Sequence, residues 1–441
     1  MLSKRWMLGL TLGLLLNFHG AARASQTGSQ AFLTLGDAQN IAVANHPEIK
    51  SMLYDTFAVS EAVKIARSGY APQAYGEAVQ TLAQPQTRLS AYNELNDPTV
   101  IQRTALGVGV SQYITDFGRT TAMVKASEFD LNAQKAGADL TRDTVVLDVD
   151  RAYFEVLRAK ALLVVADKTK SERGSLLRQV TALQRAGLRS ILDVSIMARD
   201  VSEADQLVLE ARGRLQDSFA SLSEAMGLPA LHAYALQDVR KLPNFPSNID
   251  DIVKTALDQN PKLASLSAEE SAARERALAV ARSVLPNVSG YGFFGATPFR
   301  AVNQSIASSY AAVGVSMNVP IFNGGALAAE KRQAGDQQAV AQANVDVERD
   351  QLLRDVHIAY VGVKTTRGNI DVSEQLFKTA LQALELTQAR YRIGLNSIVD
   401  LSEAQLSATQ AEISHTNAVY DYILQGAALD FLTGTLARAA L

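Results

Sequence analysis

Residues 143–162 read DTVVLDVDRAYFEVLRAKAL, and their apolar side chains recur at the spacing of a helix. Val145, Val149 and Ala152 belong to an apolar series that repeats every three or four residues. Side chains at that spacing lie on one face of a helix, where a neighbouring helix can bury them. The stretch therefore predicts a helix that packs along one side.

Proline placement predicts how far this helix extends. None of the eleven prolines lies in 99–228 or in 321–441. Both stretches are rich in Ala, Leu, Gln, Glu and Arg, which favour helices. They predict two helices at about 120–185 and 326–392, each roughly 100 Å long at 1.5 Å per residue. A globular domain cannot contain helices of that length, so a coiled-coil rod or a helical barrel is expected.

Shorter helices are expected beside the long ones. Gly187 and Gly394 are suited to ending the long helices, because glycine adopts the left-handed conformation that stops a helix. Two short helices laid end to end span about the same 100 Å as one long helix. Each half of the chain is therefore expected to hold one continuous helix against two stacked ones. The short helices are predicted at 37–70, 190–226, 250–284 and 397–433.

The chain also repeats itself once. The motif Gly-Leu-x-Ser-Ile-x-Asp occurs at 187–193 and again at 394–400, and Ala-Tyr occurs at 152–153 and 359–360. Further landmarks recur in the same order, always 205 to 214 residues apart. Such regular recurrence predicts an internal duplication. The predicted units are a first repeat at 25–228, a linker at 229–249 and a second repeat at 250–441.

Two segments, 106–114 and 313–319, switch to the period of two that is typical of β-strands, and each has a predicted partner strand before it. Aliphatic side chains alternate with small or polar ones, as in a strand that faces lipid on one side. Two soluble hairpins, half-buried on a core, are the alternative. Four strands cannot close a sheet, so insertion into a membrane requires an oligomer, with twelve strands from three chains or eight from two. The strands are predicted at about 73–84, 104–115, 287–297 and 310–320.

The N-terminus has the pattern of an export signal. Lys4 and Arg5 precede a twelve-residue apolar run, and Ala22-Arg23-Ala24 supplies a signal-peptidase site. We expect 1–24 to be a signal peptide, which leaves 39 basic against 45 acidic residues. That balance argues against nucleic acid, and the absence of cysteine excludes disulfides, thiolate metal sites and a lipidated N-terminal Cys. The location is then soluble periplasmic or in the outer membrane.

Catalytic motifs are absent from the sequence. The four histidines after the leader are scattered, and there is no HExxH, Gly-x-Ser-x-Gly or Walker loop. We therefore predict no enzyme activity, and no catalytic, cofactor-binding or metal-binding residues. A periplasmic coiled-coil or adaptor-like protein without a channel is the alternative function. It accounts for the helices but not for the two alternating strand pairs.

Taken together, these features resemble the TolC family of outer-membrane channels. The tandem repeat, the paired strands, the Ala-Tyr pairs and the aromatic-Gly turns at 117–119 and 322–325 carry the resemblance, which covers about 33–436. It implies a mixed α/β membrane protein with a channel-tunnel fold. A long antiparallel α-helical barrel would cross the periplasm, and four transmembrane strands per chain would contribute to a twelve-stranded trimeric β-barrel in the outer membrane.

The resemblance also implies partners. A homotrimer would act as the passive exit duct of a tripartite efflux pump or a type I secretion system. A periplasmic adaptor, also called a membrane fusion protein, would connect it to an inner-membrane RND or ABC pump. By position, the adaptor would contact Gly187, Leu188, Gly394 and Leu395. The cargo, drug or secreted protein, is not specified by any residue.

The family's periplasmic gate maps onto the same helix tips. Asp400 and Glu403 match its crowded acidic positions, three residues apart and so on one helix face. Asp193 and Tyr391 match positions that hold the tip closed by bonding to a basic residue. Where the family has that arginine, this chain has Asn396, and Arg189 or Arg392 is expected to substitute. From the residues alone, the favoured interpretation is that Asp193 and Asp400 each cap the start of a short helix, which needs no gate.

Overall fold

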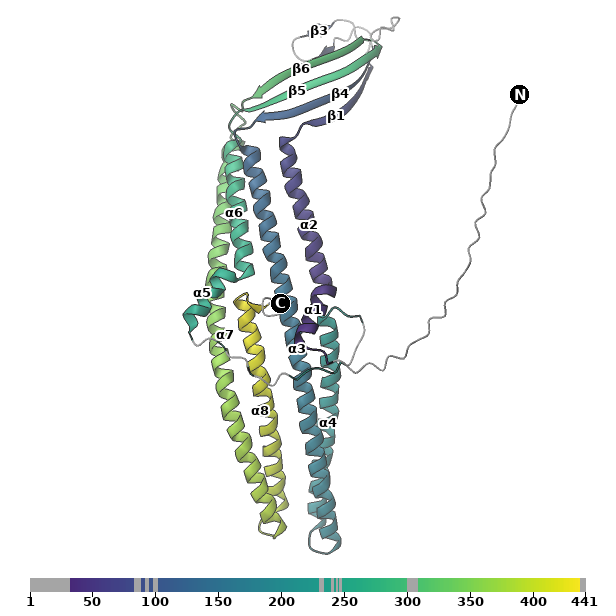
Figure 1. Ribbon diagram of the computed structural model, residues 1–441, viewed down its shortest axis with the longest axis vertical. Coiled ribbons are helices and arrows are strands. Elements are labelled where there is room, and N and C mark those ends of the chain that lie inside the picture. The colour runs from purple at the N-terminus through teal and green to yellow at the C-terminus, as the bar shows by residue number, and fades with distance from the viewer. Residues whose placement is uncertain are drawn as a thin grey trace, which may run out of the picture.

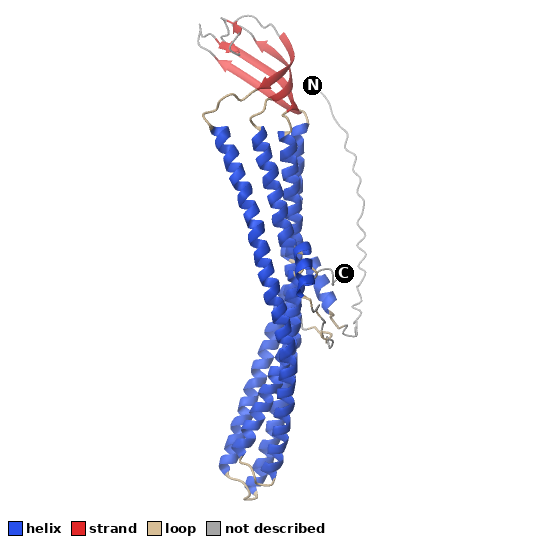
Figure 2. Ribbon diagram, turned by 90° about the vertical axis from the view of Figure 1, so that its left-hand side faces the viewer, coloured by secondary structure: helices blue, strands red, loops and turns tan. Residues whose placement is uncertain are grey.

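The computed structural model shows a long helical rod with a small β-sheet at one end (Figures 1 and 2). Residues of the expected signal peptide, 1–24, lie outside the described part of the chain, as do many of the linker 229–249. Among the described residues, no helix has the length and hydrophobicity needed to cross a membrane. The structure describes residues 32–82, 89–91, 95–97, 102–229, 234–238, 242, 245, 248–299 and 308–436.

Two long helices run along the rod. Helix α3 spans Arg119–Arg185 and helix α7 spans Ala326–Arg392, 67 residues each and so about 100 Å long. Each turns back into a shorter helix, α4 at Ile191–Ala225 and α8 at Ile398–Leu432, and these are 35 residues each. The equal lengths show the duplication in three dimensions. Two helical hairpins, α3–α4 and α7–α8, form the half of the rod farthest from the sheet (Figure 1).

The segments 37–70 and 250–284 were each expected to be one helix, and that expectation is wrong. Each is divided at the residue before a proline, His46 in the first repeat and Asn260 in the second, where the backbone is extended. A proline disfavours helical geometry in the residue before it, so the chain bends there. That residue then caps the following helix with its side chain. The four helices are α1 Leu35–Asn45, α2 Pro47–Arg67, α5 Ile249–Gln259 and α6 Pro261–Arg282.

The bends place α1 and α5 beside the middle of the rod (Figure 1). There the start of the described chain is fastened to α3. The fully buried Tyr153 donates its hydroxyl to the carbonyl oxygens of Leu33, at 2.9 Å, and Gln237, at 2.8 Å. Leu33 also forms a β-bridge with Leu236. The Tyr of one Ala-Tyr pair therefore joins the N-terminal segment, the inter-repeat segment and the long helix.

A buried carboxyl lies close to this junction. Asp150 of α3 accepts a 2.6 Å hydrogen bond from the Nε2 of Gln39 of α1. Burial is the main cause that raises the pKa of Asp150 to about 7; the Gln39 hydrogen bond opposes the shift and the nearby Asp430 assists it. Burial also raises the pKa of Asp430 to about 6. Both carboxyl groups therefore keep their protons to a higher pH in the folded protein than in the unfolded chain.

Asp150→Asn is expected to stabilise the protein at pH 8, and to stabilise it by a clearly smaller amount at pH 5. A carboxyl whose pKa is raised on folding takes up a proton, so the free energy of unfolding falls as pH rises from about 4 to about 7. Asparagine stays neutral and can still accept from Gln39, so about 2–4 kcal/mol should be regained above pH 7. Thermal midpoints of the variant and the wild type at both pH values measure this difference in stability.

The neighbouring Asp148→Asn is the matched control for this prediction. Asp148 is on the same helix but half exposed, with Arg151 at 3.4 Å. Because its carboxylate is solvated, the substitution should change the thermal midpoint little at either pH. Equal effects of Asp150→Asn at pH 5 and pH 8 would contradict the raised pKa.

The sheet has four antiparallel strands in the order β1-β4-β5-β6 within the described residues. The first strand of the second repeat, β5, pairs with the last strand of the first repeat, β4. Strands β1 and β6 are left as the two edges. The four strands are β1 Gln73–Leu82, β4 Gln102–Thr115, β5 Asn287–Phe299 and β6 Ser308–Asn318. A separate two-stranded hairpin pairs β2, Leu89–Ala91, with β3, Leu95–Asp97.

The two faces of the sheet differ in polarity. The register aligns Val108 with Phe294, and a row further along the same face holds Val313, whose side chain is 79 % exposed. The opposite face carries serines, glycines and a cluster of aromatic rings. On that face Tyr75 lies over Gly109, where a Cβ would leave its ring no room. One face is therefore apolar and the other polar with aromatic rings.

Candidate functional site at the helix tips

Each helical hairpin ends in a tight glycine turn at the tip of the rod. Gly187 has φ 73° and Gly394 has φ 82°, which glycine adopts without strain. The next residue donates its N–H back into the helix, Leu188 to Leu183 O and Leu395 to Arg390 O, both at 2.9 Å. These bonds complete a Schellman motif. Leu188 is 68 % exposed and Leu395 66 %, so both turns present an apolar side chain to solvent.

Asp193 and Asp400 take part in capping the helices that follow the turns. Ser190 and Ser397 accept hydrogen bonds from the backbone N–H groups of Asp193 and Asp400, each at 3.1 Å. The Asp400 carboxylate in turn accepts from the Ser397 N–H at 2.9 Å. That backbone hydrogen bond, followed by one from the Ser397 side chain, lowers the pKa of Asp400. Asp400 is therefore ionised at neutral pH.

The capping role leaves the Asp400 carboxylate free for a second role. A carboxylate has about four lone-pair sites, and the cap uses part of them. Glu403 is exposed and lies one helical turn further along α8, on the same face as Asp400. The structure thus presents two acidic side chains together near the tip of one hairpin.

Tyr391 and Arg189 meet between the two hairpins. The Nη2 of Arg189 donates to the backbone oxygen of Tyr391 at 2.6 Å, and its guanidinium lies 4.3 Å from the centre of the Tyr391 ring. Tyr391 is 3 % exposed, and burial raises the pKa of its hydroxyl, opposed by Arg189 and assisted by Asp193. Arg189, one of the two arginines expected to substitute at the tip, therefore bonds to Tyr391 across the two hairpins.

One buried acidic residue near the tip, Asp200, was not predicted from the sequence. Asp200 of α4 is 2 % exposed and accepts a 2.6 Å hydrogen bond from the hydroxyl of Ser402 on α8. The helical spacing of the sequence could have indicated its burial, because Asp200 lies on the same face of α4 as the buried Met197 and Ala204. A carboxylate in such a series must find partners in the fold.

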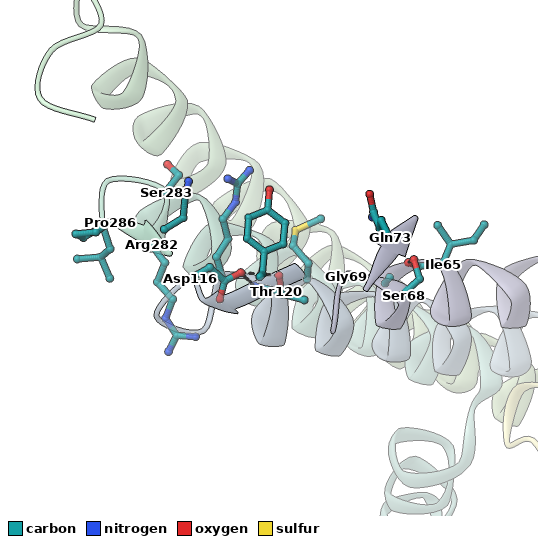
Figure 3. Close-up of a pocket in the computed structure, with 15 residues that line it drawn as sticks. Ile65, Ser68, Gly69, Gln73, Asp116, Thr120, Arg282, Ser283 and Pro286 are labelled. Atoms are coloured by element: carbon teal, nitrogen blue, oxygen red, sulfur yellow. Dashed lines mark hydrogen bonds between the residues drawn. The ribbon is translucent and has the colours of Figure 1, made fainter. Parts of the chain in front are cut away.

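The other end of the rod holds a cleft where the helices meet the sheet (Figure 3). Its volume is about 350 Å³. Asp116 accepts from the backbone N–H groups of Gly118, at 3.0 Å, and Thr120, at 2.7 Å, and Arg282 donates to Gly118 O at 2.7 Å. These bonds stiffen the passage from β4 into α3. The cleft therefore lies at the junction between the helical rod and the sheet, and its hydrogen bonds hold that junction together.

Comparison with known proteins identifies the family. The family model described as outer membrane efflux protein matches residues 38–228 and 252–435. The chain belongs to the outer membrane efflux protein family. As a member, it is an outer-membrane channel protein that serves as an exit duct, and it is not an enzyme. This confirms the expected fold class, function and location.

Individual proteins that are similar in sequence or structure to this chain are also outer-membrane or secretion proteins by name. Outer membrane protein TolC of Vibrio cholerae is 26 % identical over 417 residues, which cover 92 % of this chain and 91 % of that protein. The alkaline protease secretion protein AprF of Pseudomonas aeruginosa is 25 % identical over 243 residues, 53 % of this chain and 49 % of that protein. The crystal structure of the outer membrane protein VceC of Vibrio cholerae has the same fold, with a TM-score of 0.77, 17 % identity and coverage of 91 % and 96 %.

Proposed function

We propose that three copies of this chain form one continuous channel that receives cargo from an inner-membrane pump through a periplasmic adaptor. The observation that carries the proposal is the four-stranded sheet, which has one apolar face and two edges, β1 and β6, that pair with no other strand of the described residues. In hydrocarbon, unpaired backbone groups cost several kcal/mol each, so both edges need partners. Copies of the chain supply them when β6 of one pairs with β1 of the next.

Three copies fit the other face of the sheet better than two. Two copies would make an eight-stranded barrel, whose interior is just wide enough to be filled by side chains. The polar face already carries Tyr75, Tyr291 and Phe293, whose rings contact one another at centroid distances of 5.7 and 6.4 Å. These rings would fill such a barrel. Twelve strands leave an opening, as a duct requires.

The helical layer supports the same arrangement. Along the half of the rod next to the sheet the order is α2-α3-α6-α7, so α2 and α7 are its edges (Figure 1). Helix α2 exposes Tyr54, Phe57 and Ile65, and α7 exposes Val340 and Ile358. Apolar side chains on both edges of a helical layer favour contact between neighbouring copies. Closing the sheet brings these edges together.

The internal repeat predicts which residues meet between copies. Within one chain Val108 of β4 pairs with Phe294 of β5. Aligning the two Tyr-over-Gly pairs of the repeats maps this contact onto Val313 of β6 and Ala78 of the next copy's β1. We expect oxidised Ala78→Cys/Val313→Cys protein to give covalent trimers on a denaturing gel. The sequence contains no other cysteine to interfere.

Ala74→Cys/Val313→Cys is the matched control for the cross-link. Position 74 lies four residues along β1 on the same face, about 13 Å away, which is beyond disulfide reach. It should give monomers. A ladder that stops at two, or cross-linking of the control alone, would contradict three copies in this register.

The helix tips are the proposed periplasmic entrance. In a trimer, Asp400 and Glu403 make a ring of six carboxylates, which concentrates a negative potential and favours cations. We assign them, with Asp193 and Tyr391, to the gate. The exposed Leu188 and Leu395 offer apolar contacts to the adaptor, and Gly187 and Gly394 shape the two turns.

The proposed pump is of the RND or ABC class, and the cargo follows from the pump. The family description names efflux, whereas the relative AprF is named for protease secretion. Deleting the gene and measuring drug sensitivity and secreted protein in parallel separates the two uses. Increased drug sensitivity alone assigns an efflux pump, and loss of a secreted protein alone assigns a secretion system.

A further inference from the structure

The Asp200–Ser402 contact joins the two helical hairpins close to the tip. Asp200 lies on α4, ten residues or nearly three turns beyond the cap residue Ser190, and Ser402 lies on α8. The Ser402 hydroxyl donates to Asp200 Oδ2 at 2.6 Å and accepts a hydrogen bond from Arg199 Nη2 at 3.3 Å. The bond thus crosses from the hairpin of the first repeat to that of the second.

The remaining polar atoms of Asp200 are satisfied within its own hairpin. Arg199 donates to Oδ1 through Nε at 3.0 Å and Nη2 at 2.6 Å. The backbone oxygen of Asp200 accepts from the Nη1 of buried Arg173 on α3 at 2.8 Å. These bonds stabilise the buried carboxylate without any partner on α8. The Ser402 bond is therefore an addition whose specific effect is to hold α8 in place.

The internal repeat shows that this bond is not a general feature of the helix. Ser195 occupies in α4 the position that Ser402 occupies in α8, five residues after the capping serine. Its hydroxyl donates to Ile191 O of its own helix at 3.1 Å. Only the α8 serine bonds to the opposite hairpin. The two hairpins are therefore fastened asymmetrically.

Ser402 also lies between the two acidic residues of the gate. Asp400 and Glu403 flank it in sequence, so the rotation of α8 that aims Ser402 at Asp200 also sets where the two carboxylates point. We propose that Asp200, through Ser402, is a positioning residue that clamps the α7–α8 hairpin to the α3–α4 hairpin and keeps the entrance narrow. This inference rests on the proposed gate at Asp400 and Glu403.

Ser402→Ala tests the clamp with little disturbance. It removes one hydroxyl, and Asp200 keeps both bonds from Arg199. A hydrogen bond to a carboxylate is strong enough for its loss to raise the open probability of single channels in planar bilayers about tenfold. Ser195→Ala, the equivalent position in α4, is the matched control and should leave the open probability unchanged. The thermal midpoint should be unchanged in both variants.

Two further variants separate a clamp from general loosening. Ser402→Thr keeps a hydroxyl and should restore the wild-type open probability. Asp200→Asn weakens the same contact, so adding it to Ser402→Ala should produce little further opening if the residues act through each other. The clamp would be overturned if the two substitutions together raised the open probability by the product of their separate effects, or if Ser402→Thr failed to restore the wild-type value.

The outcome also distinguishes this inference from the gate proposal. If Ser402→Ala behaves as wild type while neutralising Asp400 and Glu403 alters cation block, the clamp is wrong and the gate stands. If neither change affects the channel, both proposals are wrong. An open probability raised equally by Ser195→Ala also contradicts the clamp, since that residue bonds only within its own helix.

Discussion

Replacing Asp400 and Glu403 together by alanine is expected to weaken block of the channel by La³⁺ about hundredfold. In the proposed trimer six carboxylates would surround the entrance, and a trivalent cation would interact with all of them at once. The lowered pKa of Asp400 means that its charge is present at neutral pH. Titrating La³⁺ against single-channel current measures the change.

A charge-only variant and a matched control complete this experiment. Asp400→Asn with Glu403→Gln keeps side-chain size, so weakened block in it reflects charge alone. Asp371 and Glu374 on α7 have the same spacing of three, but basic side chains neutralise them at 3.7 Å and 2.6 Å. Replacing this pair by alanine should leave block unchanged. Unchanged block in the Asp400/Glu403 variants would remove these residues from the gate.

Gly434→Ala is expected to prevent assembly of the folded channel. Gly434 has φ 68°, and a Cβ there would collide with the backbone oxygen of Gln259 at the end of α5. Backbone atoms cannot move aside as a flexible side chain can. Conformational strain of about 1–2 kcal/mol therefore adds to a steric clash, for a total above about 3 kcal/mol. The yield of folded oligomer and its thermal midpoint measure the loss.

Gly187→Ala separates the two contributions. Gly187 has a similar φ of 73°, but nothing lies within 4 Å of the added Cβ. This variant should lose only the strain of about 1–2 kcal/mol and still assemble. Equal thermal midpoints for the two variants would contradict the close packing of the α8 end against α5.

The fold class could be predicted because its strongest signals are local or repeated. Proline-free stretches and helical periodicity indicated the long helices, and α3 spans Arg119–Arg185 where 120–185 was expected. The division at His46 was missed because a proline is compatible with the first turn of a helix as well as with a break. Whether the chain continues or bends before it depends on what the next helix packs against.

The tip could be predicted only in part. The glycine turns and the serine caps follow from residue type and spacing, which are local. The contacts of Asp200 with Ser402 and of Arg189 with Tyr391 join residues 202 apart in the chain. Helical periodicity places such residues on a face but does not say which helix packs there. That information comes from the arrangement of the two hairpins.

Single-channel recording in a planar lipid bilayer tests the central claim most directly. Purified full-length protein, added to one side at low concentration, should insert as preassembled oligomers and produce discrete conductance steps of uniform size. The Ala78→Cys/Val313→Cys protein should give the same steps after oxidation, because the cross-link joins copies that already touch. A protein that purifies as a folded helical rod but never produces conductance steps would contradict the channel.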